Sequence, residues 1–186
     1  MKALVAYMSQ TGNTKKVAEA IFEGIEDEKE IKRIEDVDSL EGYDIAFLGF
    51  PVHKMGPDGK TTKLLEKHCI NGRDVVLFIT HAAPENSPDL PPMLEQFRQA
   101  ARGANIIDMF DCQGELGKTI KLVMSLMPDA RLRKWAKEDN SKGQPDQARL
   151  DRARFFSRNV MDTVHDIACL GGLEARLRPV VAAAIQ

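Results

Sequence analysis

The sequence predicts one α/β domain, in which a parallel β-sheet is covered by α-helices on both faces. Two segments, 43–52 and 73–80, are almost continuously apolar, as central parallel strands buried on both faces are. Further strand-like segments alternate with amphipathic helical patterns, which is the order of elements in such a sheet. With 186 residues, 43% of them apolar, the chain is long enough for one sizeable core and short for two.

The elements of this sheet can be placed in chain order. The first strand is predicted at 2–8, and a helix follows Asn13, where Val17, Ile21 and Ile25 recur at helical spacing. The remaining elements are a half-buried strand at 31–35, the central strand at 43–52, a helix at 60–68, the central strand at 73–80, a helix that starts at Ser87-Pro88-Asp89 and runs to Arg102, and a fifth strand at 104–110.

The alternation of strands and helices fails between residues 113 and 145, which we interpret as a helical insertion. Its first half places Leu116, Ile120, Val123 and Met127 on one helical face, and its second half is a basic segment around Trp135. A long amphipathic helix at 146–167 then closes the domain, with inward positions Leu150, Ala153, Val160, Val164 and Ile167. We therefore expect one domain over 1–170 and a C-terminal tail at 171–186.

The composition of the chain indicates where the protein is located and which kinds of site it lacks. No apolar run approaches the length of a membrane span and no cleavable leader follows Met1, so we expect a cytoplasmic protein. The three cysteines are far apart and form no CxxC pair, which favours small buried side chains over disulfides or a metal site. Residues 1–112 hold 13 Lys/Arg and 19 Asp/Glu, whereas residues 113–186 hold 13 and 9. This split indicates either two faces with different partners or a solvated basic helix face.

The loop between the first strand and the first helix is rich in small polar residues: Ser9, Gln10, Thr11, Gly12, Asn13 and Thr14. A loop at the carboxyl end of a parallel strand presents free backbone N–H groups and the positive end of the following helix dipole. Because the loop contains no lysine or arginine, it suits a monophosphate held by neutral donors. The alternative is that these side chains only cap the helix.

Two segments resemble part of a loop that binds nucleoside triphosphates, but neither has the full motif. Gly-Lys-Thr occurs at 59–61 and at 117–119, but Lys54 and Cys112 stand where a Walker A loop needs its first glycine. No GxGxxG motif for a nicotinamide nucleotide and no GxSxG nucleophile elbow is present. We expect neither nucleic-acid binding nor a metal centre.

The hexapeptide Ser9–Thr14, between strand and helix at the chain start, resembles the phosphate-binding loop of the flavodoxin family. This resemblance implies a flavodoxin-like three-layer sandwich, with a five-stranded parallel sheet in the order 2-1-3-4-5 and FMN as cofactor. It also implies that the flavin ring lies between the loops after strands 3 and 4. The residues carried over from these loops are Pro51, Val52, His53, Lys54, Met55, Gly56, Thr80, His81, Ala82 and Ala83.

These two loops depart from the family pattern, because they offer His53, Met55 and His81 where an aromatic ring usually stacks on each flavin face. Lys54 would place a cation near the ring, and the Met55-Gly56 peptide could flip as the flavin is reduced. Either histidine could instead be an ordinary exposed loop residue.

Three functions stay open at this point. The first is an FMN-binding electron carrier between redox proteins, and the second is an FMN-dependent reductase of a quinone or another small acceptor, with His53 or His81 as proton donor. The third is a flavin-free interaction module. The insertion could cap the flavin, bind a partner through Arg131, Arg133, Lys134 and Lys137, rest on an anionic membrane, or form a small packing subdomain.

Overall fold

The computed structural model describes residues 1–183 of the backbone and the side chains of residues 1–170. Its centre is a five-stranded parallel sheet in the order β2-β1-β3-β4-β5. This confirms the predicted fold class and strand order. The strands are β1 Lys2–Tyr7, β2 Glu28–Arg33, β3 Ile45–Pro51, β4 Asp74–His81 and β5 Asn105–Gln113.

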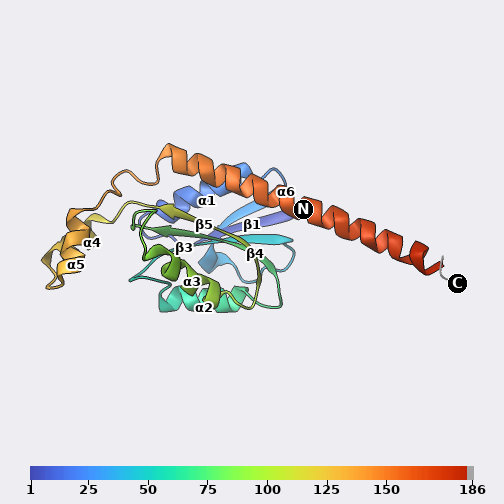
Figure 1. The fold of residues 1–186 in the computed structure, drawn as a ribbon, viewed down its shortest axis with the longest axis horizontal. Helices are drawn as coiled ribbons and strands as arrows, with labels where there is room; N and C mark the ends of the chain where they lie inside the picture. Colours follow the sequence, from blue (N-terminus) through green and yellow to red (C-terminus); the bar gives the residue numbers. More distant parts are fainter. Residues whose placement is uncertain (184–186) are drawn as a thin grey trace.

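Helices cover both faces of the sheet (Figure 1). The helices α1 (Asn13–Gly24) and α6 (Gln147–Ala183) pack together on one face, and α2 (Gly59–His68) and α3 (Leu90–Ala100) pack on the other. The remaining helices, α4 (Lys118–Leu126) and α5 (Ala130–Lys137), lie beyond the end of the sheet, and a 3-10 turn at Ile34–Asp36 follows β2. The chain therefore forms three layers with one helical hairpin outside them.

Two apolar cores stabilise these layers, one on each face of the sheet. In β1, Val5 packs toward α1 and α6, whereas its neighbours Leu4 and Ala6 pack toward the opposite face, as the strand period of two requires. The central strands bury large aromatic side chains, among them Phe47 and Phe78, both 0% exposed. Each such burial contributes about 1.5–3 kcal/mol, so the sheet interior dominates the stability of the fold.

The element boundaries differ from the predicted ones where contacts between strands decide them. β2 begins and ends earlier than predicted because it pairs with β1 in the register Lys2↔Glu28, and β5 extends to Gln113 because it follows β4 to His81. The inward assignment on the long helix is correct for Ala153, Val160 and Val164. It is wrong for Ile167, which is 59% exposed because α6 has passed beyond the packed core at that point.

The last helix also continues past Gly171 and Gly172, where the sequence suggests a break, to Ala183. Residues 184–186 lie outside the described residues. The division into a domain at 1–170 and a tail at 171–186 stays a prediction. Across the helices that the structure describes, none combines the length and apolar character that a bilayer crossing requires. The predicted cytoplasmic location likewise stays a prediction.

The cysteines differ in their surroundings. Cys69 and Cys112 are buried, as predicted, and burial raises the pKa of each thiol to about 12. Cys169 is exposed on α6, so the prediction that it is a small buried side chain is wrong. Since only the thiolate attacks disulfide reagents, we expect one thiol to react with Ellman's reagent in the native protein and all three in denaturant. A second fast-reacting thiol in the native protein would contradict the packing of the core.

Candidate functional site at the carboxyl edge of the sheet

The three predicted loops meet where β1, β3 and β4 end. Pro51 is in register with Thr80 across β3 and β4, and the Val52 N–H donates to the Thr80 carbonyl over 2.8 Å. The loop after β1 is joined to the same strand end, because the hydroxyls of Thr14 and Thr80 lie 2.8 Å apart. The strand order reverses between β1 and β3, which is where ligands bind in open α/β sheets.

The loop 9–14 leaves the start of α1 open to a ligand. Gly12 has the left-handed φ of 94°, and among the described side chains none caps this helix. The Ser9 hydroxyl accepts a hydrogen bond from the Gly12 N–H over 3.1 Å, so it shapes the loop itself. The hypothesis that the polar residues only cap the helix therefore lacks support, and the first-turn amides keep their capacity to bind an anion.

Thr14 is nearly fully buried, at 1% exposed, and its hydroxyl contacts that of Thr80. One of these hydroxyls must donate to the other, since each carries one proton. If Thr80 donates, the Thr14 proton stays available to a ligand in the loop; if Thr14 donates, its role is to join the loop to β4. Thr11 and Gln10, by contrast, are exposed on the loop surface.

The loop after β3 contains a tight two-residue turn. His53 and Gly56 exchange backbone hydrogen bonds of 2.8 and 3.0 Å, and between them Lys54 and Met55 have φ values of 44° and 80°. Glycine or asparagine normally occupies such positions, so two larger side chains make the turn strained. The Gln96 side chain of α3 donates to the Met55 carbonyl over 3.0 Å and holds the turn in place.

A cavity of about 390 Å³ lies beside this turn, lined by His53, Lys54, Gly56, Pro57, Asp58 and Gln96. The Nε2 atom of His53 is buried there and has no hydrogen-bond partner among the described residues; Asp58 Oδ2 lies 3.9 Å away. Burial raises the pKa of the Asp58 carboxyl, but the hydrogen bond from the Thr61 backbone N–H and the neighbouring groups outweigh it, and the pKa lies below its usual value. The cavity is thus lined by an anionic carboxylate and by a histidine whose buried Nε2 has no partner among the described residues.

His81 lies differently from the exposed or ring-stacking histidine that the sequence suggests. Its side chain is 1% exposed, and its Nδ1 lies 2.9 Å from the Ala83 carbonyl while its Nε2 lies 3.1 Å from Asp111 Oδ2. Both neighbouring atoms are acceptors, so whichever ring nitrogen carries the proton donates to one of them. This leaves His53 as the loop histidine that can meet a ligand. Ala82 and Ala83 are held through their carbonyls, by Gln113 and His81 respectively.

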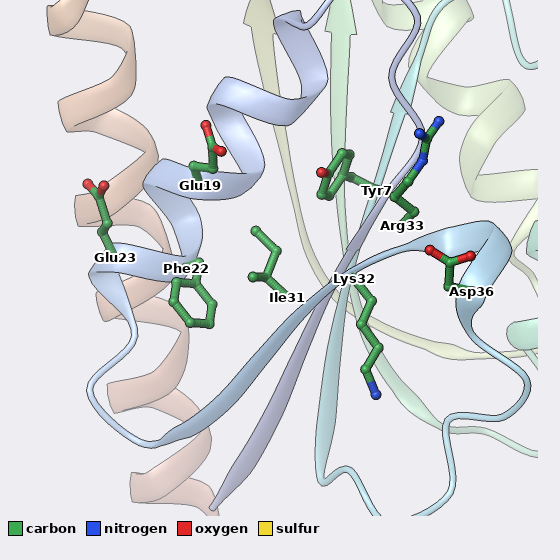
Figure 2. Close-up of a pocket in the computed structure, with 8 residues that line it drawn as sticks. All are labelled: Tyr7, Glu19, Phe22, Glu23, Ile31, Lys32, Arg33 and Asp36. Atoms are coloured by element: carbon green, nitrogen blue, oxygen red, sulfur yellow. The ribbon is translucent and has the colours of Figure 1, made fainter.

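A larger cavity, of about 630 Å³, lies between α1 and the edge strand β2 (Figure 2). Phe22 and Ile31 face each other in it, and its rim carries the carboxylates of Glu19, Glu23 and Asp36 as well as Arg33. With Lys32 also in the lining, three carboxylates oppose two cations, so the cavity has no excess of positive charge for an anionic ligand. Charged side chains of this kind commonly protect an edge strand from pairing. The smaller cavity, which is lined by the loop after β3 and by Gln96 of α3, is therefore the better candidate for the functional site.

Several residues of the site escape prediction from the sequence. Gln96 lies in the middle of a helix with no local signal, whereas Asp111 and Gln113 lie at the end of β5 and could have been found by assigning their side chains to the same sheet edge. Asn13 also has a distant partner, because its side chain donates to the Glu115 carbonyl over 2.9 Å. Within residues 1–170, no cluster of His, Cys, Asp or Glu side chains suits a metal ion.

The comparisons with known proteins agree with this fold. Residues 4–157 match a family model described as a flavodoxin domain. The flavodoxin-like domain-containing protein BilS of Clostridioides difficile (strain CD3) is 33% identical over 172 residues, covering 87% of this chain and 97% of BilS.

Solved structures share the fold at lower sequence identity. Oxidised flavodoxin 2 from Bacillus cereus has a TM-score of 0.57 at 19% identity and covers 88% of this chain and 99% of its own. The two-electron reduced flavodoxin of Megasphaera elsdenii has a TM-score of 0.51 at 20% identity, covering 63% of this chain and 89% of its own.

Proposed function

The chain belongs to the flavodoxin family, and we propose from this premise that it binds FMN and carries electrons between redox partners. The observation that carries the proposal is the uncapped start of α1, which opens at the strand-order reversal beside β3. Backbone amides and hydroxyls without a neighbouring cation suit the phosphate of a mononucleotide.

The residues present fit this cofactor. Ser9, Gln10, Thr11, Gly12, Asn13 and Thr14 would hold the phosphate, and the segments 51–56 and 80–83 would flank the ring. The cavity of about 390 Å³, lined by His53, Asp58 and Gln96 among others, has room and polar side chains for the edge of a ligand. FMN, when bound, supplies the capacity to accept and release electrons.

The chain's own residues set the surroundings of that ring. Lys54 contributes a positive charge beside the cavity and Asp58 a negative one, so the two oppose each other in their effect on added negative charge. Gln96 fixes the Met55 carbonyl, and with it the orientation of the Met55-Gly56 peptide. We infer that Gln96 limits the backbone flip that the sequence suggests at this peptide.

The proposal is tested by purifying the protein and recording its visible absorption. We expect a yellow protein that releases FMN on denaturation, and an apoprotein that recovers the spectrum when FMN is added back. Riboflavin, which lacks the phosphate, should bind at least about tenfold more weakly, a difference of about 1.4 kcal/mol. Equal binding of FMN and riboflavin would overturn the assignment of the loop, and a colourless protein that refuses FMN would support a flavin-free interaction module.

A second function is favoured by the same cavity. His53 lines an open space large enough for a small molecule, and a rotation of its ring, whose Nε2 is buried in this structure, would let it donate a proton to an acceptor bound there. An FMN-dependent reductase of a quinone would oxidise NADPH steadily when only these components are mixed. A protein that exchanges electrons with redox proteins but fails to turn over NADPH with the quinone is a carrier.

A further inference from the structure

The hairpin of α4 and α5, here called the arm, stands outside the layers of the fold. It projects from the end of the sheet where the strands terminate (Figure 1). The two helices pack mainly on each other. All of α4 lies in the described part of the chain and none of its residues is buried, while α5 buries only Ala136. The arm therefore contributes little to the core.

The surface of α4 is apolar over most of its circumference. Leu126 is 78% exposed, Leu122 61% and Val123 50%, and Ile120, Met127 and Trp135 of the adjoining α5 are also exposed. Single exposed apolar side chains are common, but a contiguous group of this size on one element marks an interaction site. Three of the residues that the sequence places on one apolar helical face, Ile120, Val123 and Met127, are thus exposed in this structure.

The charges around this apolar surface are mostly positive. Residues 117–142 hold seven Lys/Arg and three Asp/Glu. Arg131 is 92% exposed and Lys134 is 70% exposed, and their only acidic partners among the described residues lie 3.6 and 4.0 Å away within the same helix or its cap. A partner that covers the arm should therefore present acidic groups around an apolar patch.

The base of the arm lies against loop 9–14 of the candidate flavin site. A β-carbon on Gly117 would lie 3.6 Å from Thr11 Cγ2, which places the start of α4 against the loop 9–14. The base is fixed by the Asn13 side chain on the Glu115 carbonyl and by Lys121 on the buried Asp139 carboxylate at 2.7 Å. Hydrogen bonds from Lys121 and Ser141 outweigh burial and lower the pKa of Asp139, so this carboxylate is charged at neutral pH.

We propose that the arm is the docking surface for an acidic redox protein that presents an apolar patch rimmed by Asp and Glu. The proposal rests on the proposed electron-carrier function, because the position of the arm beside loop 9–14 would bring such a partner to the edge where the flavin is expected. A second copy of the chain fits less well, since it would set one basic rim against another. An anionic membrane would complement the positive charges of the arm, but it gives no reason for the arm to lie beside the cofactor loop.

The test measures binding of an acidic [2Fe–2S] ferredoxin by calorimetry, on both the FMN-loaded protein and the apoprotein. Leu122→Ser/Leu126→Ser removes the two most exposed apolar side chains of the arm without touching the core, and Phe155→Ser, on a 64% exposed residue of α6, is the matched control. We expect the arm variant to bind at least about tenfold more weakly and the control to bind like the wild type. Unchanged binding in the arm variant would overturn the proposal.

The charge component has its own pair of variants. Arg131→Glu/Lys134→Glu should weaken ferredoxin binding and reduce its salt dependence, whereas Arg158→Glu on α6 should change neither. Loss of binding to vesicles of phosphatidylcholine and phosphatidylglycerol in the arm variants, with ferredoxin binding unchanged, would assign the arm to a membrane instead. A concentration-dependent dimer that the arm variants abolish would assign it to self-association and overturn the proposal.

Failure of this proposal is distinguishable from failure of the proposed function. Binding of ferredoxin is read from heat, and FMN retention is read from visible absorption of the same variants. A yellow protein that binds ferredoxin equally well as the wild type and as the arm variants refutes the docking surface alone. A colourless protein that refuses FMN refutes the electron carrier, and with it the premise of the docking proposal.

Discussion

Gly12→Ala is expected to weaken FMN binding by at least about tenfold, or about 1.4 kcal/mol. Gly12 has a φ of 94°, which an alanine adopts only with strain, and the relaxed loop would turn its amides away from the ligand. A β-carbon at this position would meet no atom within 4 Å, so the effect comes from the backbone conformation and not from a clash within the protein. Fluorescence titration of the apoprotein with FMN measures the change.

The matched control is Gly42→Ala. Gly42 has a similar φ of 84°, also has open space around its β-carbon position, and lies in the turn before β3, away from the carboxyl edge. Both substitutions should lower the free energy of unfolding of the apoprotein by a similar amount, about 1 kcal/mol. Only Gly12→Ala should lose FMN affinity. Equal affinities in the two variants would show that the loop 9–14 does not hold the phosphate.

The sheet could be predicted from the sequence because its determinants are local. Continuous apolar runs at β3 and β4 and helical spacing after Asn13 are readable without any contact between distant segments. The strand order was then implied by the resemblance of the hexapeptide Ser9–Thr14 to the flavodoxin family. Boundaries such as the early start of β2 and the late end of β5 depend on pairing with a neighbouring strand, and no single segment encodes them.

The candidate site was only partly predictable for the same reason. Its loops could be located because parallel strands end at a common edge, but the state of each side chain depends on partners far along the chain. His81 is engaged by Asp111, thirty residues later, and Met55 is held by Gln96, forty-one residues later. The face of α4 differs from these residues, because no segment of the described chain covers it. Its helical pattern predicts an apolar face, but the pattern does not identify the partner that would cover that face.

Gly49→Ala is expected to destabilise the fold by about 1–3 kcal/mol through overpacking. Gly49 lies in β3 directly beside Phe78 of β4, and a β-carbon on it would lie 2.0 Å from the Phe78 ring. The Phe78 ring is fully buried and surrounded by core side chains. Because such cores are closely packed, the ring has no free space into which it can move. The Gly49 carbonyl also accepts the Met8 N–H over 2.9 Å, so displacement of β3 would reach the start of loop 9–14. Urea unfolding measures the loss.

A double-mutant cycle separates this clash from a general intolerance of side chains in β3. Phe78→Leu alone should destabilise the protein, because a smaller side chain leaves a cavity in the core. Combined with Gly49→Ala, it should cost less than the two single changes added together, since the added methyl group fills part of the space that the ring has left. Full additivity would mean that the Phe78 ring does not rest on Gly49. The apoprotein should be used throughout, because bound FMN would stabilise the native state and obscure the coupling.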